Sequence, residues 1–170
     1  MEQKFRLLTP AELTDNVFKL ISEDCMLITA GSLEHYNTMT ASWGGLGVLW
    51  HKPIAFCVVR PTRYTYEFME SAEGFTLTFF TEEYKDVLEI CGSVSGRDTD
   101  KAAAAHITPV EPTPGRVSFQ EARLVLECRK LYYQDLDPAH FLDESIGGMY
   151  KKGDYHRMYV GEITGCRIRE

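Results

Sequence analysis

Short polar side chains and glycines follow one another between residues 37 and 47. The segment reads Asn37, Thr38, Met39, Thr40, Ala41, Ser42 and Trp43, with glycines at positions 44, 45 and 47. Backbone amides and small hydroxyls can hydrogen-bond the polar edge of a planar heterocycle, and glycine permits its close approach. A polar, solvent-facing strand followed by a flexible turn has the same composition, so the segment alone leaves both interpretations open.

A second segment combines positive charge with a predicted helix start. Arg60 and Arg63 flank Pro61 and Thr62, and Tyr64 and Thr65 follow directly. Guanidinium groups, hydroxyls and the free N–H groups of a helix N-terminus together bind phosphate. On this segment alone, a helix cap flanked by two solvated arginines is the more common explanation.

The third segment runs from residue 93 to residue 101. Gly96 allows a tight turn, and Lys101 could reach a phosphate as a point charge. The alternative is a helix capped by Asp98 or Thr99, with Lys101 in water. Elsewhere, only His156, beside Tyr155 in a predicted strand, is placed to face a ligand.

Several classes of site have no sequence support. The five cysteines and five histidines show no CxxC or HxxxH spacing, so we expect neither a metal site nor a disulfide framework. GxSxG, GxGxxG and GxxxxGK[ST] patterns do not occur. The net charge of −7 argues against nucleic-acid or anionic-membrane partners. The first residues resemble no secretory signal, and we expect a cytoplasmic protein.

The elements that must position these segments are mostly strands. Apolar and alternating runs predict strands over residues 26–33, 37–43, 53–60, 75–80, 122–133 and 155–168. Residues 75–80 should be half-buried, with threonines on one face. Helices are predicted over 9–22, from Thr62, over 81–90 and from 98 or 99 through 105, with 108–116 a loop or edge connection.

The order of elements lacks the regular strand–helix alternation of a doubly wound sheet. We therefore predict a mainly β fold, an antiparallel Greek-key barrel with helical insertions. At 170 residues the chain fits a single domain over 1–170, with residues 1–24 as a helical N-terminal segment.

Three segments in this order resemble the flavin reductase-like family, which includes the flavoredoxins. They are residues 37–44 (NTMTASWG), 60–65 (RPTRYT) and 95–101 (SGRDTDK). Residues 75–80, 121–129 and 154–163 are also similar to the family. The resemblance covers about residues 25 to 165.

The resemblance implies an FMN-binding split β-barrel that dimerises and holds FMN non-covalently near the subunit interface. By position, residues Asn37 to Ser42 would line the isoalloxazine ring, with Trp43 beside it. The phosphate would be bound by Arg60, Tyr64 and Thr65, with Arg63 in the same motif and Lys101 adding charge. We expect Arg60 to matter most, because it ends a buried strand.

The leading functional hypothesis is an FMN-dependent oxidoreductase whose flavin is reduced by NADH or NADPH. The alternatives are a flavoredoxin-like electron carrier or FMN-binding module, and a flavin-free structural dimer. We also predict a homodimer, because several aromatic side chains on or near the last strands need cover: Tyr132, Tyr133, Phe141, Tyr155 and Tyr159. The same aromatics could instead fill the core of one subunit.

Overall fold

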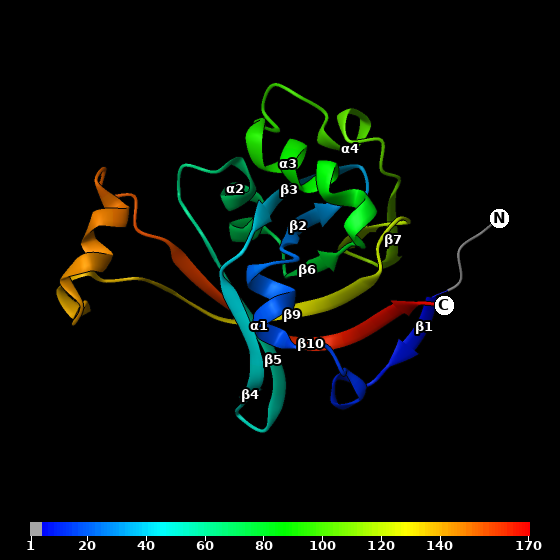
Figure 1. The fold of residues 1–170 in the computed structure, drawn as a ribbon, viewed down its shortest axis with the longest axis horizontal. Helices are drawn as coiled ribbons and strands as arrows, with labels where there is room; N and C mark the ends of the chain where they lie inside the picture. The colour runs from blue at the N-terminus through cyan, green and yellow to red at the C-terminus, as the bar shows by residue number, and fades with distance from the viewer. Residues whose placement is uncertain (1–4) are drawn as a thin grey trace.

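A computed structural model describes residues 5–170 and shows one large antiparallel sheet (Figure 1). The strands lie in the order β3-β2-β6-β9-β10-β5-β4, and β1 pairs with the far end of β10. The strands of this sheet are β1 (Phe5–Leu8), β2 (Met26–Ser32), β3 (His35–Ala41), β4 (Gly44–Leu49), β5 (Lys52–Val59), β6 (Gly74–Phe79), β9 (Leu124–Asp135) and β10 (Arg157–Arg169). The predicted mainly β fold is confirmed.

The sheet curls into a barrel that stays open between its first and last strands. β3 and β4 form the two ends of the strand order, although only Ser42 and Trp43 separate them in the chain. The core inside the curve contains side chains such as Phe75, Leu77 and Tyr159, all fully buried. The chain thus crosses the mouth of the barrel at Trp43.

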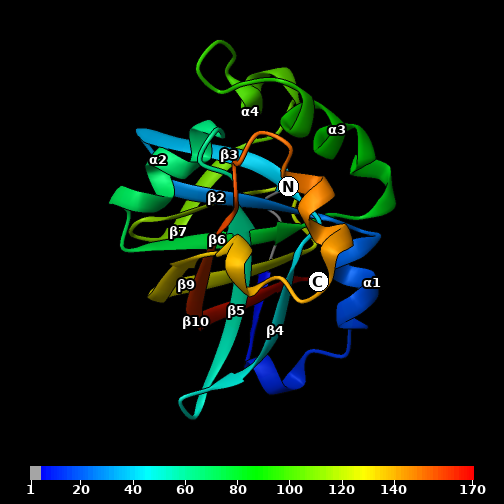
Figure 2. The same cartoon turned by 90° about the vertical axis from the view of Figure 1, so that its left-hand side faces the viewer.

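Most of the helices cover the β3 end of this sheet (Figure 2). α2 (Tyr64–Ser71) and α3 (Lys85–Ser93) pack against β2 and β3, and α4 (Lys101–Ala104) packs beside α3. α1 (Val17–Ser22) contacts β4. No helix within residues 5–170 is long and apolar enough to cross a bilayer.

The N-terminal segment differs from the single helix predicted over residues 9–22. The capping box of Thr9 and Glu12 forms, but it opens only a 3-10 turn, Pro10–Glu12, after which Leu13 is extended. A second cap, Asn16, then starts α1 by accepting hydrogen bonds from the next two free N–H groups. The segment is also not wholly helical, because β1 precedes it and pairs with β10.

Five other local features differ from those that the sequence suggested. The glycines after Trp43 form strand β4 rather than a flexible turn, and residues 108–116 contribute to a hairpin of β7 (Pro109–Thr113) and β8 (Arg116–Phe119). β6 is buried on both faces instead of being half-buried, because the β7–β8 hairpin covers the face that carries the threonines. The helix predicted from Thr81 begins as a 3-10 turn, Glu82–Tyr84, that leads into α3. Asp100, rather than the predicted Asp98 or Thr99, caps α4.

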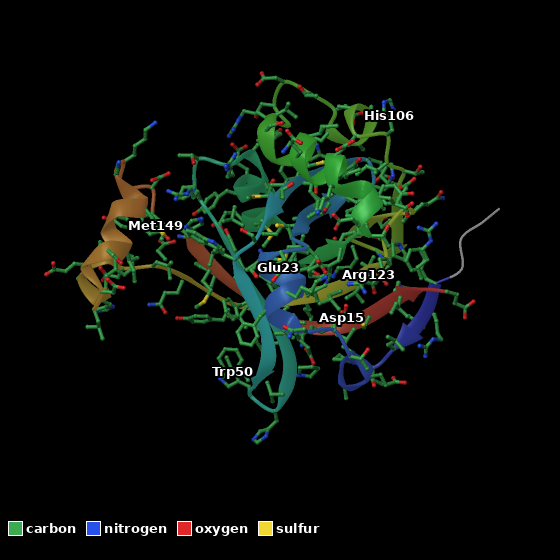
Figure 3. All side chains as sticks on the ribbon, viewed as in Figure 1. Asp15, Glu23, Trp50, His106, Arg123 and Met149 are labelled. Atoms are coloured by element: carbon green, nitrogen blue, oxygen red, sulfur yellow. The ribbon has the colours of Figure 1, made fainter. Side chains whose placement is uncertain are left out.

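The chain between β9 and β10 leaves the barrel as a projecting arm, residues 136–156 (Figure 1). It contains two 3-10 segments, Pro138–His140 and Glu144–Tyr150, around a cluster of Phe141, Tyr150 and Tyr155 rings. Figure 3 shows Met149 out on this arm. The arm joins the barrel where Arg60 pairs with Asp154 at 2.8 Å.

Candidate functional site

The side chains of the predicted polar segment point to the two opposite faces of strand β3. Successive side chains of a strand point to opposite faces, and the hydroxyls of Thr38 and Thr40 are used inside the fold. Thr38 Oγ1 donates to the carbonyl of Ile28 at 3.3 Å and lies 2.8 Å from Thr29 Oγ1. Thr40 donates to the carbonyl of Leu88 in α3. Neither hydroxyl proton is therefore left for a heterocycle. Met39 and Ala41 point the other way.

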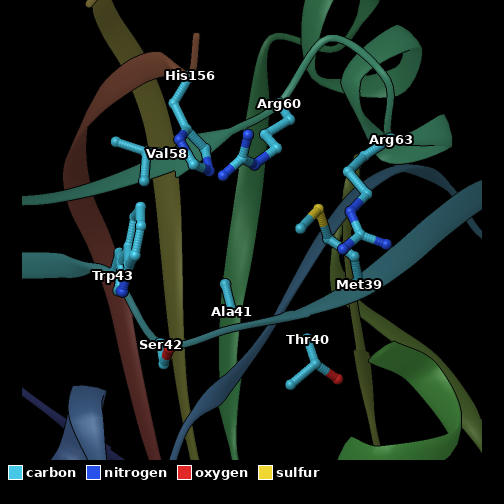
Figure 4. Close-up of a pocket in the computed structure, with 9 residues that line it drawn as sticks. All are labelled: Met39, Thr40, Ala41, Ser42, Trp43, Val58, Arg60, Arg63 and His156. Carbon is cyan, nitrogen blue, oxygen red and sulfur yellow. The ribbon is translucent and has the colours of Figure 1, made fainter. Parts of the chain in front are cut away.

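The first pocket, which we call the Trp43 pocket, has a volume of about 170 Å³ and lies at the mouth of the barrel (Figure 4). Its lining residues are Met39, Thr40, Ala41, Ser42, Trp43, Val58, Arg60, Arg63 and His156. Within the described part of the chain β3 pairs only with β2, so its outer edge offers backbone N–H and C=O groups. A planar ring with a polar edge fits this combination of flat apolar walls and backbone groups.

Arg60 lies at the top of the Trp43 pocket and is already engaged by the arm. Its guanidinium pairs with Asp154, donates to the carbonyl of Met149, and lies 4.9 Å from the centre of the Tyr150 ring. This arrangement holds the pKa of the Asp154 carboxyl below its usual value. Arg60 therefore links the arm to the Trp43 pocket. It does not line the neighbouring pocket around Lys101, which is described below.

His156 forms the wall opposite Ala41 and is 8% exposed. Its Nδ1 lies 2.7 Å from Tyr150 Oη, and its ring centre lies 5.1 Å from that of Trp43. Burial, followed by the positive charge of Arg60, lowers the pKa of His156 to about 4, although Asp154 opposes the shift. The imidazole is thus neutral at pH 7 and acts as a hydrogen-bonding group.

We expect His156 to make the ligand-free protein less stable in acid. Between pH 6.5 and 4 the imidazole of His156 is protonated in the unfolded protein and neutral in the folded protein. The free energy of unfolding therefore falls as the pH falls through this window. From pH 7 to pH 5 the loss should be about 2 kcal/mol. Urea unfolding of wild type and His156→Gln at both pH values measures it. Equal losses in the two proteins would contradict the expectation.

The second pocket, which we call the Lys101 pocket, has a volume of about 150 Å³ and adjoins the first. Met39 and Arg63 line both pockets. The other lining residues are Asn37, Thr62, Tyr64, Thr65, Ser93, Val94, Ser95, Gly96 and Lys101. The sequence prediction assigned Asn37 to the ring, but the structure places it here.

Lys101 lies at the back of the second pocket and is 8% exposed. Its ammonium donates to the carbonyls of Thr38 and Cys91, at 2.8 and 2.7 Å. Burial lowers the pKa of Lys101, Cys91 opposes this, and the nearby positive charge of Arg63 lowers it further. Two cations that repel one another beside a pocket would both be stabilised by an anion between them.

The N-terminus of α2 closes the other side of the Lys101 pocket. Arg63 is the N-cap residue, and no side chain caps the first turn of this helix. Tyr64 supports the guanidinium of Arg97, 4.6 Å from its ring centre, and Arg97 also pairs with Glu67. These contacts fasten the loop before α4 across the start of α2. Free N–H groups and two cations make the pocket suitable for a phosphate.

Five lining residues of the Lys101 pocket were absent from the predicted cofactor-binding residues: Thr62, Ser93, Val94, Ser95 and Gly96. Two lining residues of the Trp43 pocket were also absent from them: Val58 and His156. Ser93 and Ser95 stand in the segment that was singled out for Gly96 and Lys101, so their hydroxyls could have been included. Val58 carries no chemical signal, because it is one apolar residue in an apolar strand. No cluster of metal-ligating side chains occurs within residues 5–170.

Comparison with known proteins identifies the fold and the family. The chain resembles the FMN-binding domain of a flavin reductase-like enzyme from Shewanella baltica, with a TM-score of 0.68 and 16% identity over 99% of this chain and 78% of that one. An FMN-binding protein from Thermus thermophilus gives 0.67 and 20%, over 95% and 80%. Flavoredoxin from Methanosarcina acetivorans gives 0.63 and 23%, over 94% and 75%.

A comparison with curated protein sequences found no significant match. A family model does match almost the whole chain. The flavin reductase like domain aligns with residues 18–170, which include both pockets and the arm. The chain therefore belongs to the flavin reductase like domain family, with the fold of an FMN-binding split barrel.

Proposed function

We propose that the protein is an FMN-dependent oxidoreductase whose flavin is reduced by NADH or NADPH and passes electrons to an acceptor. The observation that carries this proposal is the pair of adjoining pockets that share Met39 and Arg63. One pocket suits a flat ring with a polar edge, and the other suits a dianion. FMN has these two parts at its two ends.

In this proposal, the two pockets bind different parts of FMN. The backbone of residues 39–43 and the Trp43 side chain hold the ring, with Val58 and His156 as the opposite wall. Arg63, Thr65 and Lys101 bind the phosphate together with the first turn of α2. Bound FMN supplies the redox chemistry, and the protein contributes binding, orientation and electrostatics.

The comparisons support FMN as the ligand. Two of the similar structures are described as FMN-binding, and the matched family is named for flavin reduction. The Lys101 pocket agrees with this in charge, because it places two cations beside a free helix N-terminus.

Two measurements test the proposal. Titration with FMN should quench the flavin fluorescence and raise the melting temperature, since a ligand that binds only the folded state stabilises it. Anaerobic mixing of the FMN-loaded protein with NADH or NADPH should then bleach the flavin absorbance. No quenching and no thermal shift would show that the pockets bind something else.

A flavoredoxin-like electron carrier is the second candidate, and the likeness to two flavoredoxins supports it. A carrier would retain its FMN through desalting and would not be bleached by either nicotinamide. A reductase would exchange its flavin and be bleached by at least one of them.

We further propose that the protein is a homodimer, built on the outer face of β4, β5, β9 and β10. Cross-strand pairing puts Phe56, Val160 and Tyr132 in one row, with Val58 and Met158 in the next. Cys57 and Tyr159, which alternate with them, fill the core, so this row lies on the opposite face of the sheet, where Tyr132 is 41% exposed and Val160 only 4%. An apolar surface of this kind marks a protein interface.

A second copy would also complete the ring site. The Trp43 pocket is smaller than the roughly 300–1,000 Å³ of typical ligand pockets. Val58 belongs both to this pocket and to the outer face, so a partner on that face would extend the walls of the pocket. A cytoplasmic location is part of the same proposal, because all five cysteines are free thiols.

A further inference from the structure

A buried hydrogen bond joins the two segments that form the Lys101 pocket. Asn37 Nδ2 of β3 lies 2.7 Å from Thr65 Oγ1 of α2, and the two residues are 6% and 1% exposed. This contact is the polar link between the strand that starts the ring site and the helix whose N-terminus faces the phosphate site.

The direction of this hydrogen bond follows from its neighbours. The same Asn37 nitrogen also faces the carbonyl oxygen of Thr38, at 3.4 Å, and a carbonyl can only accept. The nitrogen therefore donates in both directions, and Thr65 Oγ1 accepts. A hydroxyl has one proton, and the proton of Thr65 has no acceptor among residues 5–170.

A nearly buried hydroxyl whose proton lacks an acceptor is costly, so it points to an acceptor outside the chain. Thr65 lines the Lys101 pocket, where the cations of Arg63 and Lys101 attract an anion. A phosphate oxygen accepts hydrogen bonds and carries negative charge, which meets both needs.

We propose that Asn37 is a positioning residue for phosphate recognition: its amide fixes the hydroxyl of Thr65 so that the proton is donated to a phosphate oxygen in the Lys101 pocket. The proposal rests on the proposed FMN function and gives Asn37 a role separate from ring binding. It makes the Asn37–Thr65 pair a determinant of the preference for FMN over riboflavin, which has the same ring without the phosphate.

The surroundings of Asn37 hold its amide in place. A Cβ at Gly96 would lie 1.8 Å from Asn37 Oδ1, so only glycine allows the loop to approach this closely. Lys101 donates to the same Thr38 carbonyl at 2.8 Å, which places that acceptor beside the Asn37 nitrogen. Gly96, Lys101 and the amide of Asn37 thus pack closely together beside Thr65.

An aspartate at position 37 would reverse the arrangement without changing its size. A carboxylate oxygen would accept from Thr65, turn the proton away from the pocket and add a negative charge. We expect Asn37→Asp to weaken FMN about tenfold or more and riboflavin far less. Thr65→Val should lower FMN affinity in the same selective way, and Thr65→Ser should preserve it.

The test measures dissociation constants of FMN and riboflavin by fluorescence quenching, together with the melting temperature of each ligand-free variant. The double variant Asn37→Asp/Thr65→Val isolates the pair, because the aspartate should cost less once the hydroxyl is gone. Thr76→Val is the matched control: it removes another fully buried threonine hydroxyl, which donates to the Val117 carbonyl away from both pockets. It should lower the melting temperature and leave the FMN-to-riboflavin ratio unchanged.

The outcomes separate this inference from the proposed function. If wild type binds FMN but Asn37→Asp weakens FMN and riboflavin equally, or if the double variant shows simple additivity, Asn37 does not act through Thr65 and the inference is overturned. A wild-type protein that shows neither FMN binding nor a thermal shift with inorganic phosphate overturns the proposed function and, with it, a phosphate in this pocket.

Discussion

Replacing Arg63 by alanine is expected to weaken FMN binding by ten- to a hundredfold, while riboflavin binding changes little. The guanidinium lies where the two pockets meet, and none of the ion pairs within residues 5–170 involves it. A hydrogen bond to a charged group contributes about 1.5–3 kcal/mol, which gives that factor. Because Arg63 is exposed, the loss should shrink as salt screens the contact.

Arg60→Ala is the control for this prediction. Arg60 is bound to Asp154 and the Met149 carbonyl and lines only the Trp43 pocket, so its loss should loosen the arm and weaken FMN and riboflavin alike. Fluorescence titration of both flavins at low and high salt gives the four constants needed for each variant. An FMN-selective loss in Arg60→Ala instead of Arg63→Ala would reverse the assignment.

The sequence favoured Arg60 over Arg63, because the partner that occupies Arg60 in the structure is distant in the chain. From the local pattern, Arg60 ends a buried strand and is the better phosphate ligand. The arm brings Asp154, almost a hundred residues later in the chain, to Arg60. No local sequence pattern around Arg60 predicts this contact. Spacing indicated a candidate phosphate segment, but only tertiary structure shows that Arg60 is already paired and Arg63 is not among the paired arginines of residues 5–170.

The same limit explains what was predicted of the fold. The six predicted strands are present, because their apolar patterns are local. Three features were missed: β1, β4 and the β7–β8 hairpin. β1 is formed by pairing with β10, and the prolines and glycines of β4, β7 and the turn before β8 are not typical of strands. Gly115 takes a φ of +70° at that hairpin turn, where the sequence indicated only an irregular loop.

For the site, the sequence indicated segments that line the two pockets, but not the direction of each side chain. The hydroxyls of Thr38 and Thr40 are hydrogen-bonded within the fold, Asn37 serves the second pocket, and Lys101 binds two carbonyls behind it. Side chains of a strand alternate, so a whole segment cannot face one ligand. The residue roles carried over from the family remain predictions until the flavin titrations test them.

The tip of the β4–β5 hairpin carries strain that a dimer interface would explain. Trp50 and His51 form its two-residue turn with φ of 54° and 57°, a left-handed conformation that suits asparagine and glycine. Each such residue costs about 1–2 kcal/mol. Trp50 is nevertheless 54% exposed, with one edge against Tyr132 of the outer face (Figure 3). Strain of this kind marks functional positions, and tryptophan is enriched at interface centres.

Trp50→Asn should therefore dissociate the dimer while easing the turn that it belongs to. A central tryptophan contributes about 2 kcal/mol or more, and two-fold symmetry counts it twice, so the dimer should weaken roughly a thousandfold. His51→Gly is the matched control, because it relieves the neighbouring strain and keeps the tryptophan. It should raise the melting temperature and remain dimeric.

Light scattering at micromolar protein distinguishes the two variants. The monomeric variant should bind FMN and riboflavin more weakly by the same factor, since a partner would extend only the ring pocket. A wild-type monomer, or a Trp50→Asn dimer as tight as wild type, would show that the strained tryptophan serves something other than self-association.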